Sequence, residues 1–239
     1  MNIAVIFAGG VGSRMKTEDG TPKQFLEIGG APILIHTLNN FQQDATIDAI
    51  VVVMKEEYIG RTNVLLEEFK ITKVRKVVAG GETGQESIYQ GLIAAKEISE
   101  SDSDIVLIHD GVRPFVEDGL IRENVEAVKK YGSAISCAPS KETVVKIDES
   151  GDLNEVIDRS KVWLARAPQS FFLKDILTEH EAARERGENN IIDSCTMMMG
   201  AGKKLHIVET SAENIKITTP EDFYVATGLI MRKKMEQHE

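Results

Sequence analysis

Small residues and positive charges follow the first apolar run of the chain. Residues 3–7 lead into the segment Ala8-Gly9-Gly10-Val11-Gly12-Ser13-Arg14, and Lys23 follows shortly after. Glycines let a backbone turn sharply and approach a bound group, and the amino end of a following helix favours anions. Fixed cations beside such a loop can stabilise the negative charge of a triphosphate while one of its phosphorus atoms is attacked. The segment predicts a phosphate-binding loop; a glycine turn that only packs a helix on a strand is the structural alternative.

The spacing of this loop excludes two better-known phosphate loops. The chain has no Gly-x-x-x-x-Gly-Lys-Ser/Thr segment. A dinucleotide fingerprint that began at Gly10 and Gly12 would require a third glycine where Met15 stands. A nicotinamide-dependent dehydrogenase is therefore unsupported.

An acidic residue and a basic residue follow another apolar run, residues 105–108. Asp110 comes after one histidine, and Arg113 lies in a turn that Pro114 stiffens. The carboxylate could hold Mg²⁺ on a triphosphate or bind a hydroxyl, and the guanidinium could meet an anion. An internal salt bridge between the two residues is the alternative interpretation.

Two further segments have weaker signals of their own. Gly80 and Gly81 open a second glycine-rich turn, and Ser87 stands where it could contact a polar base edge, although a plain strand-to-helix loop explains the turn equally well. Lys216 lies in an extended segment before a helix that Thr219 can cap. An extended lysine usually points to solvent, so its function stays open on these grounds.

The elements that must position these residues alternate along the chain. Strands are expected at residues 3–7, 49–54, 73–78, 105–108, 134–138 and 204–208. Helices are expected at residues 33–41, 58–69, 87–98, 120–131 and 173–185. This alternation predicts an α/β fold with a doubly wound, mainly parallel sheet. Because ligands bind beyond the carboxyl ends of such strands, the glycine loop and the Asp110 turn should share one edge.

The alternation breaks at residues 141–163, which resemble two strands joined across a turn at residues 148–152. A lone two-stranded ribbon is marginal in water. We therefore expect a projecting hairpin arm that packs on a second copy of the subunit, and hence a homodimer.

Composition bounds the remaining possibilities. The 239 residues, 42% of them hydrophobic, indicate one globular domain spanning residues 1–239. A net charge of −10 argues against general binding to nucleic acid or an anionic membrane. No signal peptide or membrane span is recognisable, so we expect a cytoplasmic protein. The two cysteines, Cys137 and Cys195, and the scattered histidines predict no disulfide framework and no histidine metal site.

Taken in order, these motifs resemble those of a known family. The glycine loop, the Asp-Gly-Val-Arg-Pro turn, the second glycine turn, Arg159 with Trp163 and Pro168-Gln169, and Asn214-Ile215-Lys216 resemble the cytidylyltransferases that act on 2-C-methyl-D-erythritol 4-phosphate or D-ribitol 5-phosphate. The resemblance spans nearly the whole chain. It implies a fold of the nucleotidyltransferase type, a homodimer formed through the arm, and the use of CTP with Mg²⁺.

The resemblance also implies a role for individual residues. Arg14, Lys23 and Lys216 would act at the reacting phosphate, Asp110 would lie near the ribose and the metal, and Arg113 with Thr143 and Arg159 of the partner's arm would bind the acceptor. The expected nucleotide-binding residues are Ala8, Gly9, Gly10, Gly12, Gly80, Gly81, Ser87 and Asp110.

Departures from the family pattern concern the acceptor side. Gly84 stands where the family often has Arg, and Ala167, preceded by Arg166, stands where it often has Thr. Residues 192–195 are closer to the ribitol branch, whereas residues 158–163 are closer to the methylerythritol branch. The balance slightly favours D-ribitol 5-phosphate, with 2-C-methyl-D-erythritol 4-phosphate as the alternative acceptor. A nucleotide-sugar pyrophosphorylase and a non-catalytic nucleotide-binding module are less supported alternatives.

Overall fold

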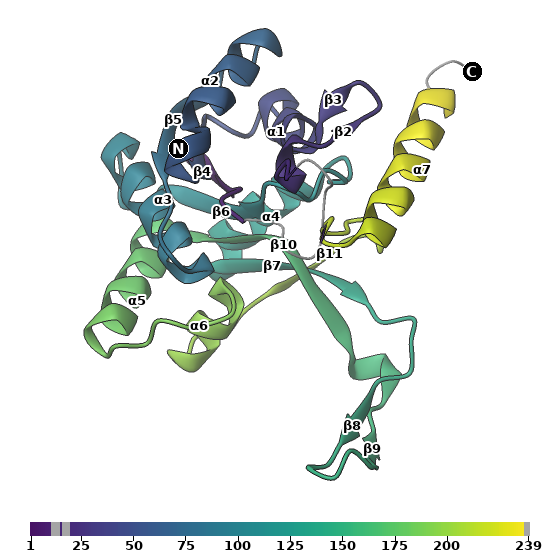
Figure 1. Cartoon of the computed structure of the whole chain (residues 1–239). Coiled ribbons are helices and arrows are strands. Elements are labelled where there is room, and N and C mark those ends of the chain that lie inside the picture. Colours follow the sequence, from purple (N-terminus) through teal and green to yellow (C-terminus); the bar gives the residue numbers. More distant parts are fainter. Residues whose placement is uncertain (11–14, 16–19, 237–239) are drawn as a thin grey trace.

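A seven-stranded sheet forms the centre of the computed structural model, which describes residues 1–10, 15 and 20–236 (Figure 1). Its order is β11-β7-β10-β6-β1-β4-β5, and β10 runs antiparallel to both of its neighbours while the other pairs are parallel. The strands are β1 (Asn2–Phe7), β4 (Ala49–Met54), β5 (Val74–Ala79), β6 (Ile105–Asp110), β7 (Ser133–Pro139), β10 (Trp163–Phe172) and β11 (Ile207–Glu209). The expected mainly parallel sheet is confirmed.

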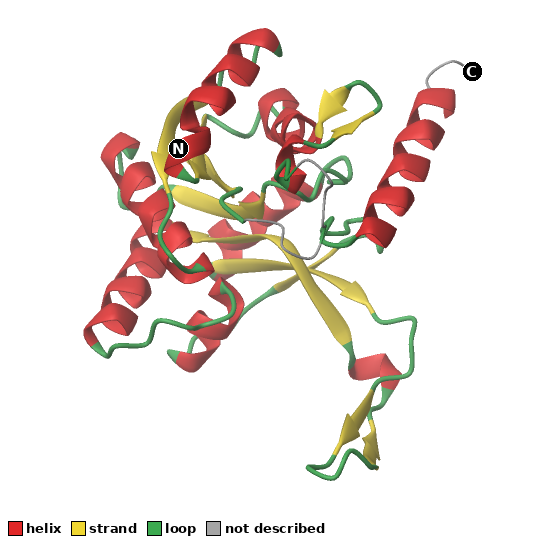
Figure 2. Cartoon of the chain, in the orientation of Figure 1, coloured by secondary structure: helices red, strands yellow, loops and turns green. Residues whose placement is uncertain are grey.

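Helices cover both faces of this sheet (Figure 2). One layer holds α1 (Ile33–Gln43), α2 (Ile59–Glu68) and α4 (Leu120–Tyr131), and the other holds α3 (Gly84–Ile98), α5 (Leu173–Glu185) and α6 (Ser194–Gly200). Successive residues of a strand point to opposite faces. In β1, Ala4 and Ile6 therefore belong to the first core and Ile3 and Val5 to the second. Burial on both faces explains why this strand reads as a continuous apolar run.

The bounds of α4 and α5 match the expected ranges, but β10 was not expected from the sequence. Pro168 argues against a central strand, since proline cannot donate a ladder hydrogen bond. In the structure, the register with β7 shifts between Ala165 and Gln169, so Pro168 lies at an irregularity where that hydrogen bond is not required. The helix expected from residue 87 begins at Gly84 instead, because the Thr83 side chain caps it by accepting from the Glu86 N–H.

The last helix, α7 (Pro220–Glu236), begins where the capping residues predict. The Thr219 hydroxyl accepts from the Asp222 N–H at 3.4 Å, and the Asp222 carboxylate accepts from the Thr219 N–H at 2.8 Å. This reciprocal pair is a capping box. Ala226 and Ile230 of α7 pack with Ile217 in a third apolar cluster, which anchors the helix beside the segment that carries Lys216.

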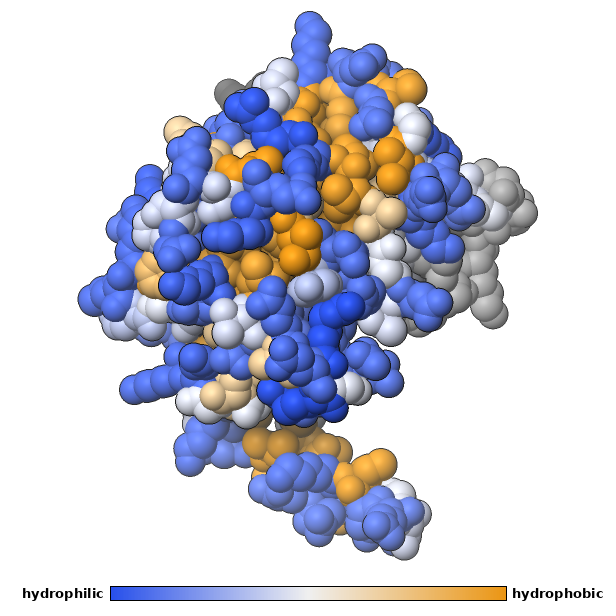
Figure 3. All heavy atoms as spheres, turned by 90° about the vertical axis from the view of Figure 1, so that its left-hand side faces the viewer, coloured by the Kyte–Doolittle hydropathy of each residue, from blue (hydrophilic) through white to orange (hydrophobic). Residues whose placement is uncertain are grey.

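Residues 141–163 include the expected hairpin, which projects from the body (Figure 1). Strands β8 (Val145–Ile147) and β9 (Leu153–Val156) pair antiparallel, and the Asp148 carboxylate accepts from the backbone of Ser150 at 2.9 Å in the connecting turn. Apolar side chains lie exposed on this arm (Figure 3): Val145, Ile147, Leu153 and Val156. Such a surface suits a protein partner, and the homodimer stays a prediction.

Short elements complete the fold. They are the 3₁₀ turns Lys23–Phe25, Glu56–Tyr58 and Arg159–Lys161 and the small strands β2 (Glu27–Ile28) and β3 (Ala31–Pro32). None of the helices in the described ranges combines the length and the apolar character needed to cross a bilayer.

Candidate active site

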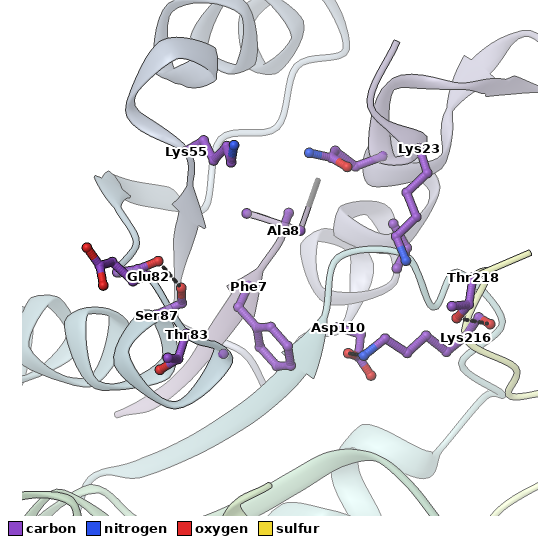
Figure 4. A pocket seen from close by; sticks show the side chains of 16 residues that line it. Phe7, Ala8, Lys23, Lys55, Glu82, Thr83, Ser87, Asp110, Lys216 and Thr218 are labelled. Atoms are coloured by element: carbon purple, nitrogen blue, oxygen red, sulfur yellow. Dashed lines mark hydrogen bonds and ion pairs between the residues drawn. The ribbon is translucent and has the colours of Figure 1, made fainter. Parts of the chain in front are cut away.

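A cavity of about 670 Å³ opens where β1, β4 and β6 end (Figure 4). The glycine loop, the second glycine turn, the turn after β6 and the segment before α7 all contribute to its walls. The residues that line it are Phe7, Ala8, Gly9, Gly10, Lys23, Gln24, Lys55, Gly81, Glu82, Thr83, Gly84, Ser87, Asp110, Val112, Lys216 and Thr218. The expectation that these motifs share one edge of the sheet is confirmed for the described residues.

The first part of the glycine loop forms the floor of this cavity. The Ala8 N–H donates to the Val53 carbonyl at 2.7 Å, which continues the sheet by one residue. A Cβ atom on Gly111 would lie 2.6 Å from the Ala8 Cβ, so the turn after β6 packs tightly on the start of the loop. Gly12 and Arg14, two of the expected phosphate-binding residues, lie outside the described residues.

Lys23 reaches the cavity from the other end of the glycine loop. It belongs to the 3₁₀ turn Lys23–Phe25, is 8% exposed and lines the cavity. In Figure 4 its side chain extends toward the region where Asp110 and Lys216 meet. Two of the three expected cations thus converge on one hollow.

Asp110 holds one cation on each carboxylate oxygen. Lys216 Nζ lies 2.5 Å from Oδ1, and Arg113 donates to Oδ2 from Nε at 3.2 Å and from Nη2 at 3.1 Å. Both Asp110 and Arg113 are buried, whereas Lys216 is exposed toward the cavity. The internal salt bridge between Asp110 and Arg113, which the sequence left open, is therefore present.

Burial and charge act in opposite directions on Asp110. Desolvation by itself would raise the pKa of the carboxyl, but the positive charges of Lys216 and Arg113 outweigh it and the pKa of Asp110 is lowered. The carboxylate is therefore negatively charged near neutral pH. The neighbouring His109 is fully buried, and desolvation lowers its pKa to about 4, so its ring is neutral there.

The segment that carries Lys216 is fixed by hydrogen bonds on both sides of the lysine. The Ile217 N–H donates to the Val112 carbonyl at 2.9 Å. Asn214 is buried, its carbonyl accepts from Arg113 Nη1 at 2.6 Å, and its Nδ2 donates to the Ala167 carbonyl at 2.8 Å. Lys216 therefore turns to Asp110 and does not point into open solvent.

The second glycine turn forms the opposite wall. Gly81 and Ser87 line the cavity, and the Ser87 hydroxyl donates to the Gly81 carbonyl at 3.3 Å. Gly80 lies behind them, where a Cβ atom would approach the Ser87 Oγ to 2.7 Å. Only glycine leaves Ser87 in this position without a shift of its neighbours. The contact of these residues with cytosine stays a prediction.

The three residues expected to bind the acceptor do not meet in one subunit. Arg113 is buried beside the cavity and is not among its lining residues. Thr143 and Arg159 are exposed on the arm, which projects from the body (Figure 1), and neither is among the residues that line the cavity. Their expected function therefore requires the arm of another subunit and stays a prediction.

Sequence reasoning missed several lining residues. Lys55 directly follows β4, so the rule that ligands bind at the carboxyl ends of strands could have found it. Gln24, 1% exposed, and Thr83, the cap of α3, also line the wall. Neither stands in a pattern that the sequence makes distinctive.

Asp110, which the family resemblance places near the metal, is one of two described carboxylates that line the cavity; the other is Glu82. Among the described residues no group of three or more His, Cys, Asp or Glu side chains is placed for metal binding. Mg²⁺ in nucleotide sites is commonly bound by one or two carboxylates together with substrate phosphates and water. Asp110 lies at the edge of a cavity that also carries lysines, which fits that manner of binding provided that Lys216 leaves Oδ1.

Comparison with known proteins gives a consistent result. The family model for 2-C-methyl-D-erythritol 4-phosphate cytidylyltransferase matches residues 2–233. The chain is 50% identical over 237 residues to a ribitol-5-phosphate cytidylyltransferase of Streptococcus agalactiae serotype V, a match that covers 99% of this chain and 98% of the relative. A ribitol-5-phosphate cytidylyltransferase of Vibrio parahaemolyticus is 49% identical, with 96% of each chain covered.

More distant matches are named for methylerythritol phosphate and not for ribitol phosphate. A 2-C-methyl-D-erythritol 4-phosphate cytidylyltransferase of Clostridium acetobutylicum is 38% identical over 237 residues, covering 99% of this chain and all (100%) of the relative. Among solved structures, the 4-diphosphocytidyl-2C-methyl-D-erythritol synthase of Anaerococcus prevotii superposes with a TM-score of 0.83 at 29% identity, covering 96% of each chain.

Proposed function

The chain belongs to the 2-C-methyl-D-erythritol 4-phosphate cytidylyltransferase family, and from this premise we propose that it transfers CMP from CTP to D-ribitol 5-phosphate. The products are CDP-ribitol and pyrophosphate. The supporting observation for the acceptor is the 50% identity to a ribitol-5-phosphate cytidylyltransferase, against 38% to a relative named for methylerythritol phosphate. The chain is a CTP-dependent nucleotidyltransferase under either acceptor.

The charges around the cavity support this chemistry. The oxygen of an acceptor phosphate is already an anion near neutral pH, so the attack needs no general base. The obstacle is the repulsion between the acceptor phosphate and the triphosphate. Lys23 and Lys216, which line one cavity, would oppose that repulsion and hold the two anions for in-line attack on the α-phosphorus of CTP. Arg14 is proposed as the third cation on the family resemblance.

Mg²⁺ belongs to the proposal as the ion that would neutralise charge on the triphosphate. Asp110 would hold it together with phosphate oxygens. Release of Lys216 from Asp110 Oδ1 would at the same time free the ammonium group for the reacting phosphate.

The arm completes the proposed site across a homodimer. Thr143 and Arg159 are exposed and do not line the cavity of their own chain, and Val145, Ile147, Leu153 and Val156 leave apolar surface uncovered. In a two-fold dimer each arm would cover its apolar side chains on the partner and bring Thr143 and Arg159 to the partner's acceptor.

Steady-state assays of pyrophosphate release test the proposed reaction. We expect the highest kcat/KM with CTP and D-ribitol 5-phosphate when each nucleoside triphosphate is paired with each acceptor. A higher kcat/KM with 2-C-methyl-D-erythritol 4-phosphate would show that this compound is the acceptor and that D-ribitol 5-phosphate is not. Preference for another nucleotide would favour a nucleotide-sugar pyrophosphorylase. Binding of CTP without pyrophosphate release under any pairing would indicate a non-catalytic module.

A further inference from the structure

Arg166 is a half-buried cation for which the described chain supplies no partner. It lies in β10, close in sequence to the end of the arm, and its buried Nε has no hydrogen-bond partner among the described residues. Among the described residues, no carboxylate lies within salt-bridge distance of its guanidinium, and no hydrogen bond engages its two terminal nitrogens. Partial burial of an unpaired guanidinium costs free energy, so its retention here calls for a ligand.

The position of Arg166 connects it to the cations of the active site. The next residue, Ala167, accepts a hydrogen bond from Asn214 Nδ2 at 2.8 Å, and the Asn214 carbonyl accepts from Arg113 Nη1 at 2.6 Å. Arg113 in turn shares Asp110 with Lys216. A continuous set of short contacts thus fixes the backbone beside Arg166 relative to Lys216.

The side chains linked by these contacts carry more positive than negative charge. Arg166, Arg113 and Lys216 are three cations, and Asp110 is the only described carboxylate that pairs with any of them. Burial lowers the pKa of Arg166, and the positive charge of Arg113 lowers it further. A phosphate monoester, with a charge of about −2 at neutral pH, matches the excess of two positive charges.

We propose that the terminal nitrogens of Arg166 bind the phosphate of the acceptor polyol, beside Lys216 and on the side of the cavity where the arm leaves the body. This inference rests on the proposed function. It adds an acceptor-binding residue from the subunit that holds CTP to those that the partner's arm would supply. Guanidinium groups suit this task because their planar N–H groups can donate two parallel hydrogen bonds to a phosphate.

Substitution of Arg166 separates phosphate binding from a structural function. In Arg166→Leu we expect the KM for D-ribitol 5-phosphate to rise about 10- to 100-fold, since a charge-assisted hydrogen bond is lost. The KM for CTP should stay within about twofold, because Arg166 lies outside the cavity wall. Arg166→Lys should recover part of the loss, and Arg122→Leu, at an exposed position on α4, is the matched control.

Thermal melting supplies a readout that does not depend on turnover. Because Arg166 lacks a partner in the described chain, Arg166→Leu should melt no lower than the wild type. With an α,β-methylene analogue of CTP present, D-ribitol 5-phosphate should raise the melting temperature of the wild type more than that of Arg166→Leu at the same concentration.

Three results would overturn the assignment of Arg166: an unchanged KM for D-ribitol 5-phosphate, an equal rise in the KM for CTP, or a melting temperature several degrees below that of the wild type. The proposed function fails separately. Absence of wild-type turnover with D-ribitol 5-phosphate would reject that acceptor, whereas wild-type turnover combined with an unchanged KM in Arg166→Leu rejects only the function of Arg166.

Discussion

Lys216 Nζ lies 2.5 Å from Asp110 Oδ1, although the two residues come from opposite halves of the chain. The other carboxylate oxygen is taken by Arg113. Arg113 is buried and has a second partner in the Asn214 carbonyl, whereas Lys216 is exposed toward the cavity. The Asp110 pair with Arg113 is therefore a fixed part of the structure, and Lys216 is the member that can exchange its carboxylate for a phosphate.

Lys216→Ala should reduce kcat/KM by about 30- to 1,000-fold, which corresponds to about 2 to 4 kcal/mol at the transition state. The fold should persist, because Asp110 keeps its two hydrogen bonds from Arg113. Pyrophosphate release measures the activity and circular dichroism measures the fold. Lys203→Ala, which removes a half-exposed lysine paired with Glu179 at 3.5 Å, is the control and should keep full activity. Unimpaired turnover of Lys216→Ala would contradict the proposed mechanism.

The wall of the second glycine turn gives a prediction about the nucleotide. In Gly80→Ala the new Cβ would lie 2.7 Å from the Ser87 Oγ and 3.3 Å from Val53 Cγ1, so Ser87 must shift. If the turn contacts cytosine, the KM for CTP should rise about 10-fold with a smaller change in kcat. Gly60→Ala is the matched control, since its Cβ meets no atom within 4 Å in helix α2. An equal KM for CTP in both variants would show that the Gly80 turn does not contact the nucleotide.

Much of this architecture could be predicted from the sequence because its signals are local. The central strands are continuous apolar runs, and a residue that directly follows a parallel strand must lie at the ligand-binding edge. Asp110 follows this rule and lines the cavity. Thr219 and Asp222 fixed the start of α7 because a capping box depends on neighbouring residues.

The remaining features depend on contacts between distant parts of the chain. Strand β10 could not be predicted because it contains Pro168, and only the register shift against β7 makes the proline acceptable there. Asn214 joins residues 113 and 167 through one side chain and its backbone, and no spacing pattern predicts such a link. That Arg166 has no partner in the described part of the chain likewise emerges only from its surroundings in three dimensions.

His180 of α5 predicts a loss of stability in mild acid. It is 1% exposed, both of its ring nitrogens lack partners among the described residues, and burial lowers its pKa to about 4. The unfolded chain therefore binds more protons than the folded protein between about pH 6.5 and pH 4, so stability falls as the pH is lowered through this range. The contribution of His180 should reach about 3 kcal/mol.

Urea unfolding at pH 7.5 and pH 5 measures this effect. In His180→Leu the difference in the free energy of unfolding between the two pH values should be smaller than in the wild type. It should not vanish, because desolvation also lowers the pKa of buried His109 to about 4. A variant whose stability falls with acid as steeply as that of the wild type would show that His180 does not contribute.

Mixing two inactive variants tests whether the arm serves the partner's cavity. Lys216→Ala disables the cavity and leaves the arm intact, whereas Arg159→Ala alters the exposed arm and leaves the cavity intact. If sites are shared across the dimer, each mixed dimer has one site with both substitutions and one site with neither. Random exchange of subunits should then restore about a quarter of the wild-type activity. If the arm served its own chain, every site in the mixture would carry one substitution and the activity would stay at the level of the separate variants.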